Sequence, residues 1–551
     1  MNDKPIRVRF APSPTGPLHL GGVRTALYNY LFARKHNGTF ILRIEDTDQN
    51  RFVPGAEAYI LEALRWCGLE ADEAVDKGGP HAPYRQSERS EIYRKYIQFL
   101  IERGHAYYAF DTPDALDALR DSYQKERGEQ FQYSVKTRNQ LSNSLTLPPV
   151  EVARKIELGE PYVMRILIPE NQDVVFHDLI RGEVRVHTDH LDDKVLFKSD
   201  GLPTYHLANV VDDHLMQISH VIRGEEWLPS APMHLLLYRF FGWEETMPQF
   251  AHLPLILKPD GHGKLSKRDG DRLGFPVFPL QWTDPSTGDV SRGYREDGYL
   301  PAAFINMLAL LGWNPGTEQE LFTIDELIHL FSLERIHKAG SKYDPDKAKW
   351  FNHQYVAALP NELLAEKLVQ LAVGSWQLAA NNIQSSSHPV IQSSSHPVIQ
   401  SSSHPVIQPN HGTLTPSHDL ADLDYATQVV SLIKDRITLI PDLLENARLF
   451  YFPPETYDPQ AKEKMWKEDT PQIIAAFLSE VQQLESWTSE FIHQLVQNFT
   501  SHSGIKMGQL MMPLRLLIVG SNQGPGVMEI AGVIGKEDFL KRIETGLLTL
   551  G

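Results

Sequence analysis

The stretch from residue 7 to residue 35 constrains this chain most, because it reads as a strand, a loop and a helix in succession. Charged and apolar residues alternate over 7–10, which predicts a short strand. Three prolines keep the loop out of any helix, and Gly21 and Gly22 open an apolar-periodic helix that an Asn-Gly pair ends. The N–H groups of such a helix start favour an anion, and His19 lies just before them as a titratable donor. The stretch predicts a phosphate site, with an ordinary strand-to-helix turn as the alternative.

The length and composition of the chain predict several domains. With 551 residues, three to five folding units are expected. No run approaches the roughly 20 apolar residues that span a bilayer, and no signal-peptide pattern opens the chain, so we expect a cytoplasmic protein with no membrane partner. The single cysteine, Cys67, excludes intrachain disulfides and cysteine-rich metal sites, so no structural zinc is expected.

The net charge of −17 argues against non-specific attraction to nucleic acid. A specific nucleic-acid partner needs only a local basic face. Four lysines between residues 335 and 349 could supply one, namely Lys338, Lys342, Lys347 and Lys349. A solvated helical face explains the same lysines equally well.

Five motifs together resemble a known family. Residues 12–22 read Pro-Ser-Pro-Thr-Gly-Pro-Leu-His-Leu-Gly-Gly. This run resembles the ATP-binding signature of class I aminoacyl-tRNA synthetases, in the form typical of glutamyl-tRNA synthetases. The resemblance continues through 43–48, 79–89, 205–214 and 264–268.

The resemblance implies an α/β fold. We expect a Rossmann-like catalytic domain with a parallel sheet, an inserted α+β domain that binds the tRNA acceptor end, and an all-helical anticodon-binding region. The catalytic halves would span 1–104 and 201–258, and the insertion 105–200. A stem-contact region would span 259–340 and the helical region 341–551.

The sequence beyond Leu300 is helical in pattern. Apolar residues three and four apart predict helices at 302–311, 324–331, 361–378, 420–446, 472–484, 486–500 and 536–547. Relatives restricted to the catalytic half lack this region, so its presence favours a full synthetase.

The sequence Lys-Leu-Ser-Lys-Arg at 264–268 follows a loop rich in Gly, Asp and His. Gly263 and Lys264 hint at a P-loop, but Leu265 stands where Ser or Thr is required and Lys258 where the first glycine should fall, so a P-loop is rejected. The run instead resembles the mobile basic loop of class I synthetases, whose cations neutralise the triphosphate; a basic surface loop is the alternative. The resemblance assigns catalysis to His19, Lys264 and Lys267, and ATP binding to these three with Gly21, Gly22, Glu226 and Ser266.

A second predicted site would hold an amino acid. The buried strand expected over 39–44 ends at Glu45, where a carboxylate could bind a substrate ammonium. The alternative, an acid that caps the next helix near Pro54, suits Asp46 or Asp48 better than Glu45. Tyr205 and Asn209 are four residues apart and would project from one face of a helix.

Two arginines at strand ends could bind the side-chain carboxylate of glutamate. Arg9 and Arg223 would each make charge-assisted contacts. For Arg223 the alternative is a structural ion pair with Glu225 or Glu226. The resemblance assigns glutamate binding to Arg9, Ala11, Ser13, Glu45, Tyr205, Asn209 and Arg223.

No metal site in the protein is predicted. Asp212, Asp213 and His214 are adjacent on a helix, point in different directions and lack a second ligand cluster. Three identical copies of Ser-Ser-Ser-His-Pro-Val-Ile-Gln occupy 385–408, and a disordered linker explains them better than a metal site. Residues 270–288 look inserted after the basic loop. The sequence assigns no role to this insertion or to the repeats.

The resemblance implies two-step aminoacylation. Glutamate would react with ATP, accompanied by Mg²⁺, to form glutamyl-adenylate, and tRNA(Glu) would then take the acyl group. A monomer is expected. The alternatives are a glutaminyl-tRNA synthetase, which the form of residues 11–16 disfavours, and a catalytically silent synthetase-like RNA-binding protein, which the intact phosphate motifs disfavour. Whether tRNA(Gln) is also charged, and which residues read the anticodon, stay open.

Overall fold

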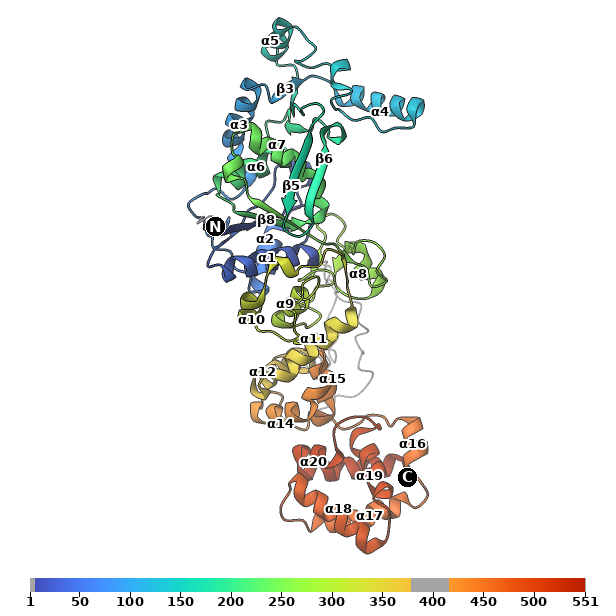
Figure 1. Cartoon of the computed structure of the whole chain (residues 1–551). Coiled ribbons are helices and arrows are strands. Elements are labelled where there is room, and N and C mark those ends of the chain that lie inside the picture. Colours follow the sequence, from blue (N-terminus) through green and yellow to red (C-terminus); the bar gives the residue numbers. More distant parts are fainter. Residues whose placement is uncertain (1–4, 378–415, 551) are drawn as a thin grey trace, which may run out of the picture. The chain divides into compact units, whose positions relative to one another are not determined.

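The chain divides into two compact units. The structure is a computed structural model that describes residues 5–377 and 416–550 (Figure 1). Unit 1 comprises Met1–Glu296 and Pro301–Ala348, and unit 2 comprises Asp297–Leu300 and Lys349–Gly551. The finer domain bounds expected from the sequence stay predictions. The repeats at 385–408 lie outside the described residues.

Unit 1 is built on a six-stranded sheet with the order β2-β1-β8-β9-β5-β6. Neighbouring strands run parallel except for the hairpin of β5 with β6. The chain leaves β1 for β2 on one side and has β8 on the other, so the strand order reverses at β1. In open α/β sheets, ligands bind at the carboxyl ends of the strands at such a reversal. The strands are β1 Arg7–Phe10, β2 Thr39–Leu42, β5 Asp173–Asp178, β6 Gly182–His187, β8 His220–Gly224 and β9 Gln249–Leu253.

The two faces of β1 carry different side chains. Phe10 lies near α1 (Leu20–Lys35), where a Cβ on Gly22 would sit 3.8 Å from the Phe10 ring. Arg9 binds Asp213 on α6 (Tyr205–Leu215). Because successive side chains of a strand point to opposite faces, α1 and α6 cover opposite sides of the sheet. Further helices of this layered unit are α2 Ala56–Trp66, α3 Ser90–Glu102, α7 Ala231–Phe240, α9 Pro301–Ala309 and α10 Ile324–Leu330.

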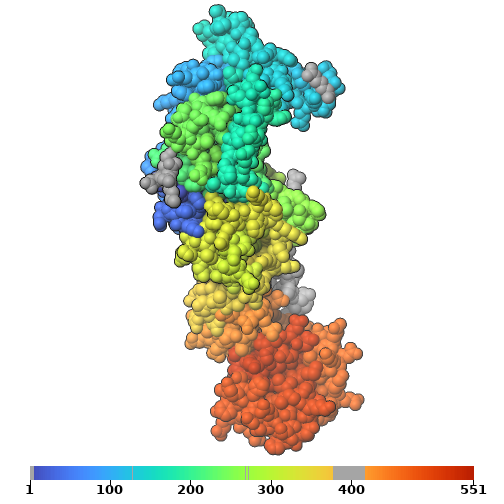
Figure 2. All heavy atoms as spheres, in the orientation of Figure 1, coloured from blue at the N-terminus to red at the C-terminus, as the bar shows by residue number. Residues whose placement is uncertain are grey.

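The segment expected as an insertion has a sheet of its own. Its antiparallel strands are ordered β3-β4-β7, and a small core forms around Tyr107, Leu116 and Tyr133. The hairpin of β5 and β6 within the same segment instead extends the central sheet, because β5 pairs with β9. In Figure 2 this hairpin forms a teal ridge on the surface of unit 1. The other elements are β3 Ala106–Ala109, α4 Pro113–Arg127, α5 Pro149–Glu157, β4 Val163–Ile166 and β7 Val195–Phe197.

Short elements shape the basic loop. β10 (Ile256–Leu257) pairs with β13 (Ser341–Lys342), and Leu257 bridges to Lys264 on the far side of the turn. α8 (Lys267–Leu273) follows, and β11 (Trp282–Thr283) pairs with β12 (Val290–Ser291). Both arms of the loop are therefore anchored by backbone hydrogen bonds.

Unit 2 is helical in its described part. Its helices pack around one apolar core. The single helix predicted over 420–446 is wrong: one helix ends at Ile433, a 3-10 turn follows over Lys434–Arg436, and a second helix begins at Asp442, directly after Pro441. Proline is tolerated at a helix start, where its missing N–H costs no intrahelical hydrogen bond. α11 Pro345–Ala358 leads into the unit, followed by α12 Asn361–Ala372, α14 Leu423–Ile433, α15 Asp442–Tyr451, α16 Pro459–Met465, α17 Thr470–Gln482, α18 Ser489–Ser503, α19 Met507–Val519 and α20 Val527–Leu550. None of the helices in the described part of the chain is long and apolar enough to cross a membrane.

Candidate active site

Two adjoining cavities open where β1 and β8 end. Each has a volume of about 390 Å³. The first contains His19 and Lys264, and the second contains Glu45 and Arg223. The wall between them is made of residues that line both cavities, namely Gly21, Gly22, Thr25, Gly224 and Glu226. A ligand in one cavity therefore lies beside a ligand in the other.

His19 is held in one orientation at the start of α1. It caps the helix, and its Nδ1 accepts the N–H of Gly21 at 3.1 Å. An imidazole that accepts at Nδ1 carries its proton at Nε2 when neutral. His19 lines the first cavity, so its side chain can serve as a hydrogen-bond donor to an anionic ligand there.

The helix start differs from the expectation of free N–H groups. The Leu20 N–H donates to the carbonyl of Val277 at 2.9 Å, and the N–H groups of Gly22 and Val23 both donate to the carbonyl of His19. That part of the sequence interpretation was wrong, because the local turn and a distant segment satisfy these donors. The positive end of the helix dipole still faces the cavity.

Val277 belongs to the segment 270–288, for which the sequence suggested no role. Phe278 packs edge-on against His19, with 6.2 Å between the ring centres. The N–H of Leu280 donates to the hydroxyl of Tyr59 at 3.1 Å. The segment thus lies against the histidine motif and fixes its turn.

Lys264 reaches the same cavity from the basic loop. Its Nζ lies 2.9 Å from Oε1 of Glu226, and both side chains are about half exposed. Ser266 donates to the carboxylate of Asp269 through its backbone N–H at 2.9 Å and its hydroxyl at 2.6 Å. These bonds lower the pKa of Asp269 to about 2. Lys267 begins α8, and its side chain lies outside the described part of the structure.

The second cavity collects every residue predicted to bind glutamate. Arginine, hydroxyl, carboxylate and amide groups from β1, the first loop, the end of β2, α6 and β8 meet there. They are Arg9, Ala11, Ser13, Glu45, Tyr205, Asn209 and Arg223. The first and last of these residues are 214 positions apart in the sequence, so it is the fold that brings them together.

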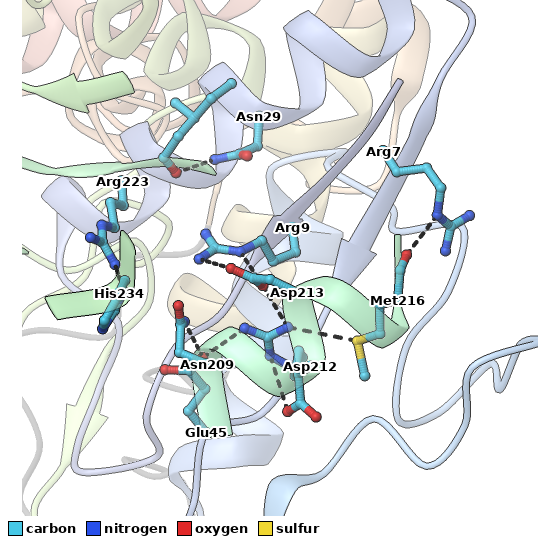
Figure 3. A network of polar contacts seen from close by, with 12 residues as sticks. Arg7, Arg9, Asn29, Glu45, Asn209, Asp212, Asp213, Met216, Arg223 and His234 are labelled. Carbon is cyan, nitrogen blue, oxygen red and sulfur yellow. Dashed lines mark hydrogen bonds and ion pairs between the residues drawn. The ribbon is translucent and has the colours of Figure 1, made fainter. Parts of the chain in front are cut away.

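Beside this cavity, Arg9 and Arg43 share the carboxylate of Asp213. Figure 3 labels Arg9 and Asp213 within this network. Asp213 accepts two bonds from Arg9, at 2.9 and 3.1 Å, and one from Arg43, at 2.9 Å. All three side chains are buried. Burial alone would raise the pKa of Asp213, but the two arginines hold that pKa below its usual value.

Glu45 faces the second cavity with one oxygen already occupied. Its Oε1 accepts from Arg43 at 2.9 Å and from Asn209 at 3.1 Å. No hydrogen bond from residues 5–377 or 416–550 reaches Oε2. Burial raises the pKa of Glu45, and the neighbouring arginines oppose that rise. The carboxylate is therefore oriented to receive a cation from the cavity.

Arg223 has neutral hydrogen-bond partners, and neither of the two glutamates weighed as alternative partners binds it. Its Nη1 donates to the hydroxyl of Tyr205 at 2.7 Å, and its Nη2 donates to the carbonyl of Trp227 at 3.3 Å. Glu225 pairs with Arg181 and Glu226 with Lys264. The alternative of a structural ion pair for Arg223 with either glutamate is wrong, so its charge stays available for an anionic ligand.

Comparison with known proteins identifies the family of this chain. A family model described as tRNA synthetases class I (E and Q), catalytic domain, matches residues 5–350, and one described as an anticodon binding domain matches 404–547. The glutamate–tRNA ligase of Phocaeicola vulgatus is 51% identical over 551 residues and covers 100% of both chains. This chain belongs to the class I glutamate–tRNA ligase family.

Another relative and two solved structures belong to the same family. The glutamate–tRNA ligase of Cytophaga hutchinsonii is 49% identical, covering 100% of this chain and 98% of its own. A crystal structure of a glutamate tRNA ligase from Elizabethkingia meningosepticum, in complex with its amino acid, has a TM-score of 0.89 and 46% identity, with full coverage of both chains. A glutamate–tRNA synthetase structure from Elizabethkingia anophelis has a TM-score of 0.85 and 45% identity, covering 99% of this chain and 100% of that one. The predicted family and fold class are confirmed.

The three adjacent residues weighed as a metal site have other uses in this synthetase. Asp213 binds Arg9 and Arg43, and Asp212 accepts a hydrogen bond from Arg89 at 2.8 Å. His214 stacks on Trp243, with ring centres 3.6 Å apart. Both aspartates point into one buried polar network, so the argument that adjacent side chains diverge was wrong for this pair. Within the described residues no group of three or more His, Cys, Asp or Glu could hold a metal ion.

Sequence reasoning missed several residues that line the cavities of this synthetase. Arg24 lines the first cavity, and its guanidinium donates to the carbonyls of Leu311 and Pro254. Asp48 and Arg51 line the second cavity. Asp48 was interpreted only as a helix-capping acid, although it lies in the motif at 43–48; Arg24 and Arg51 carry no local pattern that marks them.

Proposed function

We propose that this synthetase activates L-glutamate with ATP and transfers it to tRNA(Glu). The observation that carries the proposal is the pair of adjoining cavities. One is lined by the predicted amino-acid residues and the other by six of the seven predicted ATP residues, Lys267 being the exception. The shared wall would allow the substrate carboxylate to meet the α-phosphate.

The second cavity would bind glutamate at both ends. The unoccupied oxygen of Glu45 would accept from the ammonium group. Arg223 would contact the side-chain carboxylate, with Tyr205 holding its guanidinium in place. Arg9 also lines this cavity, and its bond to Asp213 fixes its position. A neutral amide would pair poorly with two buried arginines, which favours glutamate over glutamine.

The first cavity would bind the ATP phosphates. His19 would donate from Nε2, and Lys264 would leave Glu226 to neutralise charge on the triphosphate. Lys267 would add a second cation from the start of α8. Mg²⁺ would enter with ATP, bound mainly through the phosphate oxygens, since Mg²⁺ is commonly held by substrate phosphates and few carboxylates.

No protein nucleophile is needed. The α-carboxylate of glutamate attacks the α-phosphate and pyrophosphate leaves; a ribose hydroxyl of the terminal nucleotide then attacks the acyl carbon and AMP leaves. The chain contributes positioning and charge neutralisation. We further propose a cytoplasmic monomer whose helical unit reads the anticodon, in keeping with the anticodon binding domain matched at 404–547.

The test is pyrophosphate exchange with ATP, run with glutamate or glutamine and with or without tRNA. We expect exchange with glutamate, strongest with tRNA present, and acylation of tRNA(Glu). Glu45→Gln should raise the KM for glutamate at least about tenfold, because a charged partner of the ammonium is lost. A matched control is Glu62→Gln, which removes only a half-exposed ion pair with Arg295. Equal exchange with glutamine, or a Glu45→Gln variant with unchanged KM, would contradict the proposal.

A further inference from the structure

Three polar residues stand in a row across neighbouring strands beside the amino-acid cavity. Arg223 on β8 is directly opposite His252 on β9, and Asp178 ends β5 and pairs with Phe250 on β9. The strands β8, β9 and β5 are consecutive in the sheet. The row therefore leads from the hairpin of β5 and β6 to the guanidinium of Arg223.

Hydrogen bonds join the row from end to end. Nδ1 of His252 lies 2.6 Å from Oδ2 of Asp178, and Nε of Arg223 donates to Nε2 of His252 at 3.1 Å. All three residues are buried, with His252 and Asp178 fully so. An arginine Nε–H can only donate, so Nε2 of His252 must be unprotonated and its proton must lie on Nδ1, where the carboxylate accepts it. The tautomer is thus fixed from both sides.

Asp178 is itself held rigidly. Its Oδ1 accepts hydrogen bonds from the backbone N–H groups of Ile180 at 3.0 Å and Arg181 at 2.8 Å. Both residues lie in the turn that joins β5 to β6. Burial alone would raise the pKa of Asp178, but the bonds from His252 and these N–H groups keep it below the usual value. Burial chiefly lowers the pKa of His252, which favours the neutral ring that the row requires.

We propose that Asp178 and His252 are positioning residues that set the orientation of Arg223 and thereby the discrimination of glutamate from glutamine. The proposal rests on the proposed function, in which Arg223 binds the side-chain carboxylate. Because His252 occupies Nε, Nη1 of Arg223 is left for Tyr205 and for Nδ1 of His234 at 3.5 Å, and Nη2 for the Trp227 carbonyl and the ligand. Rotation of the guanidinium would break the bond to His252.

The decisive variant is Asp178→Asn. Its amide oxygen can still accept the turn N–H groups, but its NH₂ would donate to Nδ1 of His252. The imidazole proton would then move to Nε2, where it faces the N–H of Arg223, so two donors oppose each other. We expect the KM for glutamate to rise about 10- to 100-fold, from the loss of a hydrogen bond to a charged group. The kcat and the KM for ATP should stay near wild type, and the ratio of kcat/KM for glutamate over glutamine should fall at least about tenfold.

Two further variants separate positioning from folding. In the Asp178→Asn background, His252→Gln offers Nε of Arg223 an amide oxygen, which accepts a hydrogen bond without depending on the position of a ring proton. This double variant should restore part of the preference for glutamate. His252→Leu removes the acceptor and should lose the preference as Asp178→Asn does. Asp173→Asn is the matched control, since Asp173 begins the same strand in an exposed pair with Arg185. It should behave as wild type.

The outcomes distinguish this inference from the proposed function. If wild type activates glutamate and Arg223→Gln loses the preference, while folded Asp178→Asn and His252→Leu keep it, the positioning role is overturned. Should Asp178→Asn fail to fold, His252→Leu alone decides by the same ratio. If Arg223→Gln itself keeps the preference, the proposed function of Arg223 fails instead.

Discussion

Asp213→Asn tests whether the buried ion network supports the amino-acid cavity. Asp213 accepts three hydrogen bonds from two arginines, and its side chain is 2% exposed. Removing one partner of a buried ion pair costs about 3–5 kcal/mol, because the remaining charge is left without compensation. We expect the substitution to destabilise unit 1 by about this amount, with Arg9 and Arg43 left to share Glu45.

Hydrogen exchange of the α6 backbone amides measures the effect within unit 1. At about 1.4 kcal/mol per factor of ten, the most protected amides should exchange roughly 10² to nearly 10⁴ times faster. The control is Glu70→Gln, which removes a surface pair with Lys77 and should cost at most about 1 kcal/mol. If α6 amides in Asp213→Asn exchange within about threefold of wild type, the network does not hold this layer and the reasoning fails.

Three further predictions concern the cavities. Lys264→Ala should lower pyrophosphate exchange at least about 10²-fold with tRNA binding by filter retention intact, and wild-type exchange would remove Lys264 from catalysis. Phe278→Ala removes the ring beside His19 and should raise the KM for ATP several-fold with the KM for glutamate unchanged; an equal rise in both would contradict a local effect. Ammonium binding needs the ionised carboxylate of Glu45, whose pKa is raised above 4.5. As the pH falls, the KM for glutamate should therefore begin to rise before the pH reaches 4.5. A Glu45→Gln enzyme with the same pH profile would refute that assignment.

Local patterns in the sequence predicted the elements that carry the motifs. Alternation placed β1 at 7–10, and the apolar run over 39–44 placed β2, which ends two residues earlier than expected. The four-residue spacing of Tyr205 and Asn209 correctly put both on one helix. These elements depend on the spacing of residues close together in the sequence, so they can be predicted from the sequence alone.

Contacts between distant segments could not be predicted where no family motif marks the residues. Asp178 and His252 are 74 residues apart, and only the order of β5 and β9 in the sheet brings them together. The role of Val277 at the start of α1 depends on a segment that looks like an insertion in the sequence. α19 was absent from the predicted helices; it contains Pro513 in its interior, and the buried leucines around that proline pack the helix into the core.

The central claim is that ATP and glutamate occupy two cavities that share a wall. A non-hydrolysable sulfamoyl analogue of glutamyl-adenylate would span that wall, so its inhibition pattern in the tRNA acylation assay is the most direct test. The account predicts inhibition competitive with both ATP and glutamate. Inhibition that is non-competitive with either substrate would contradict it.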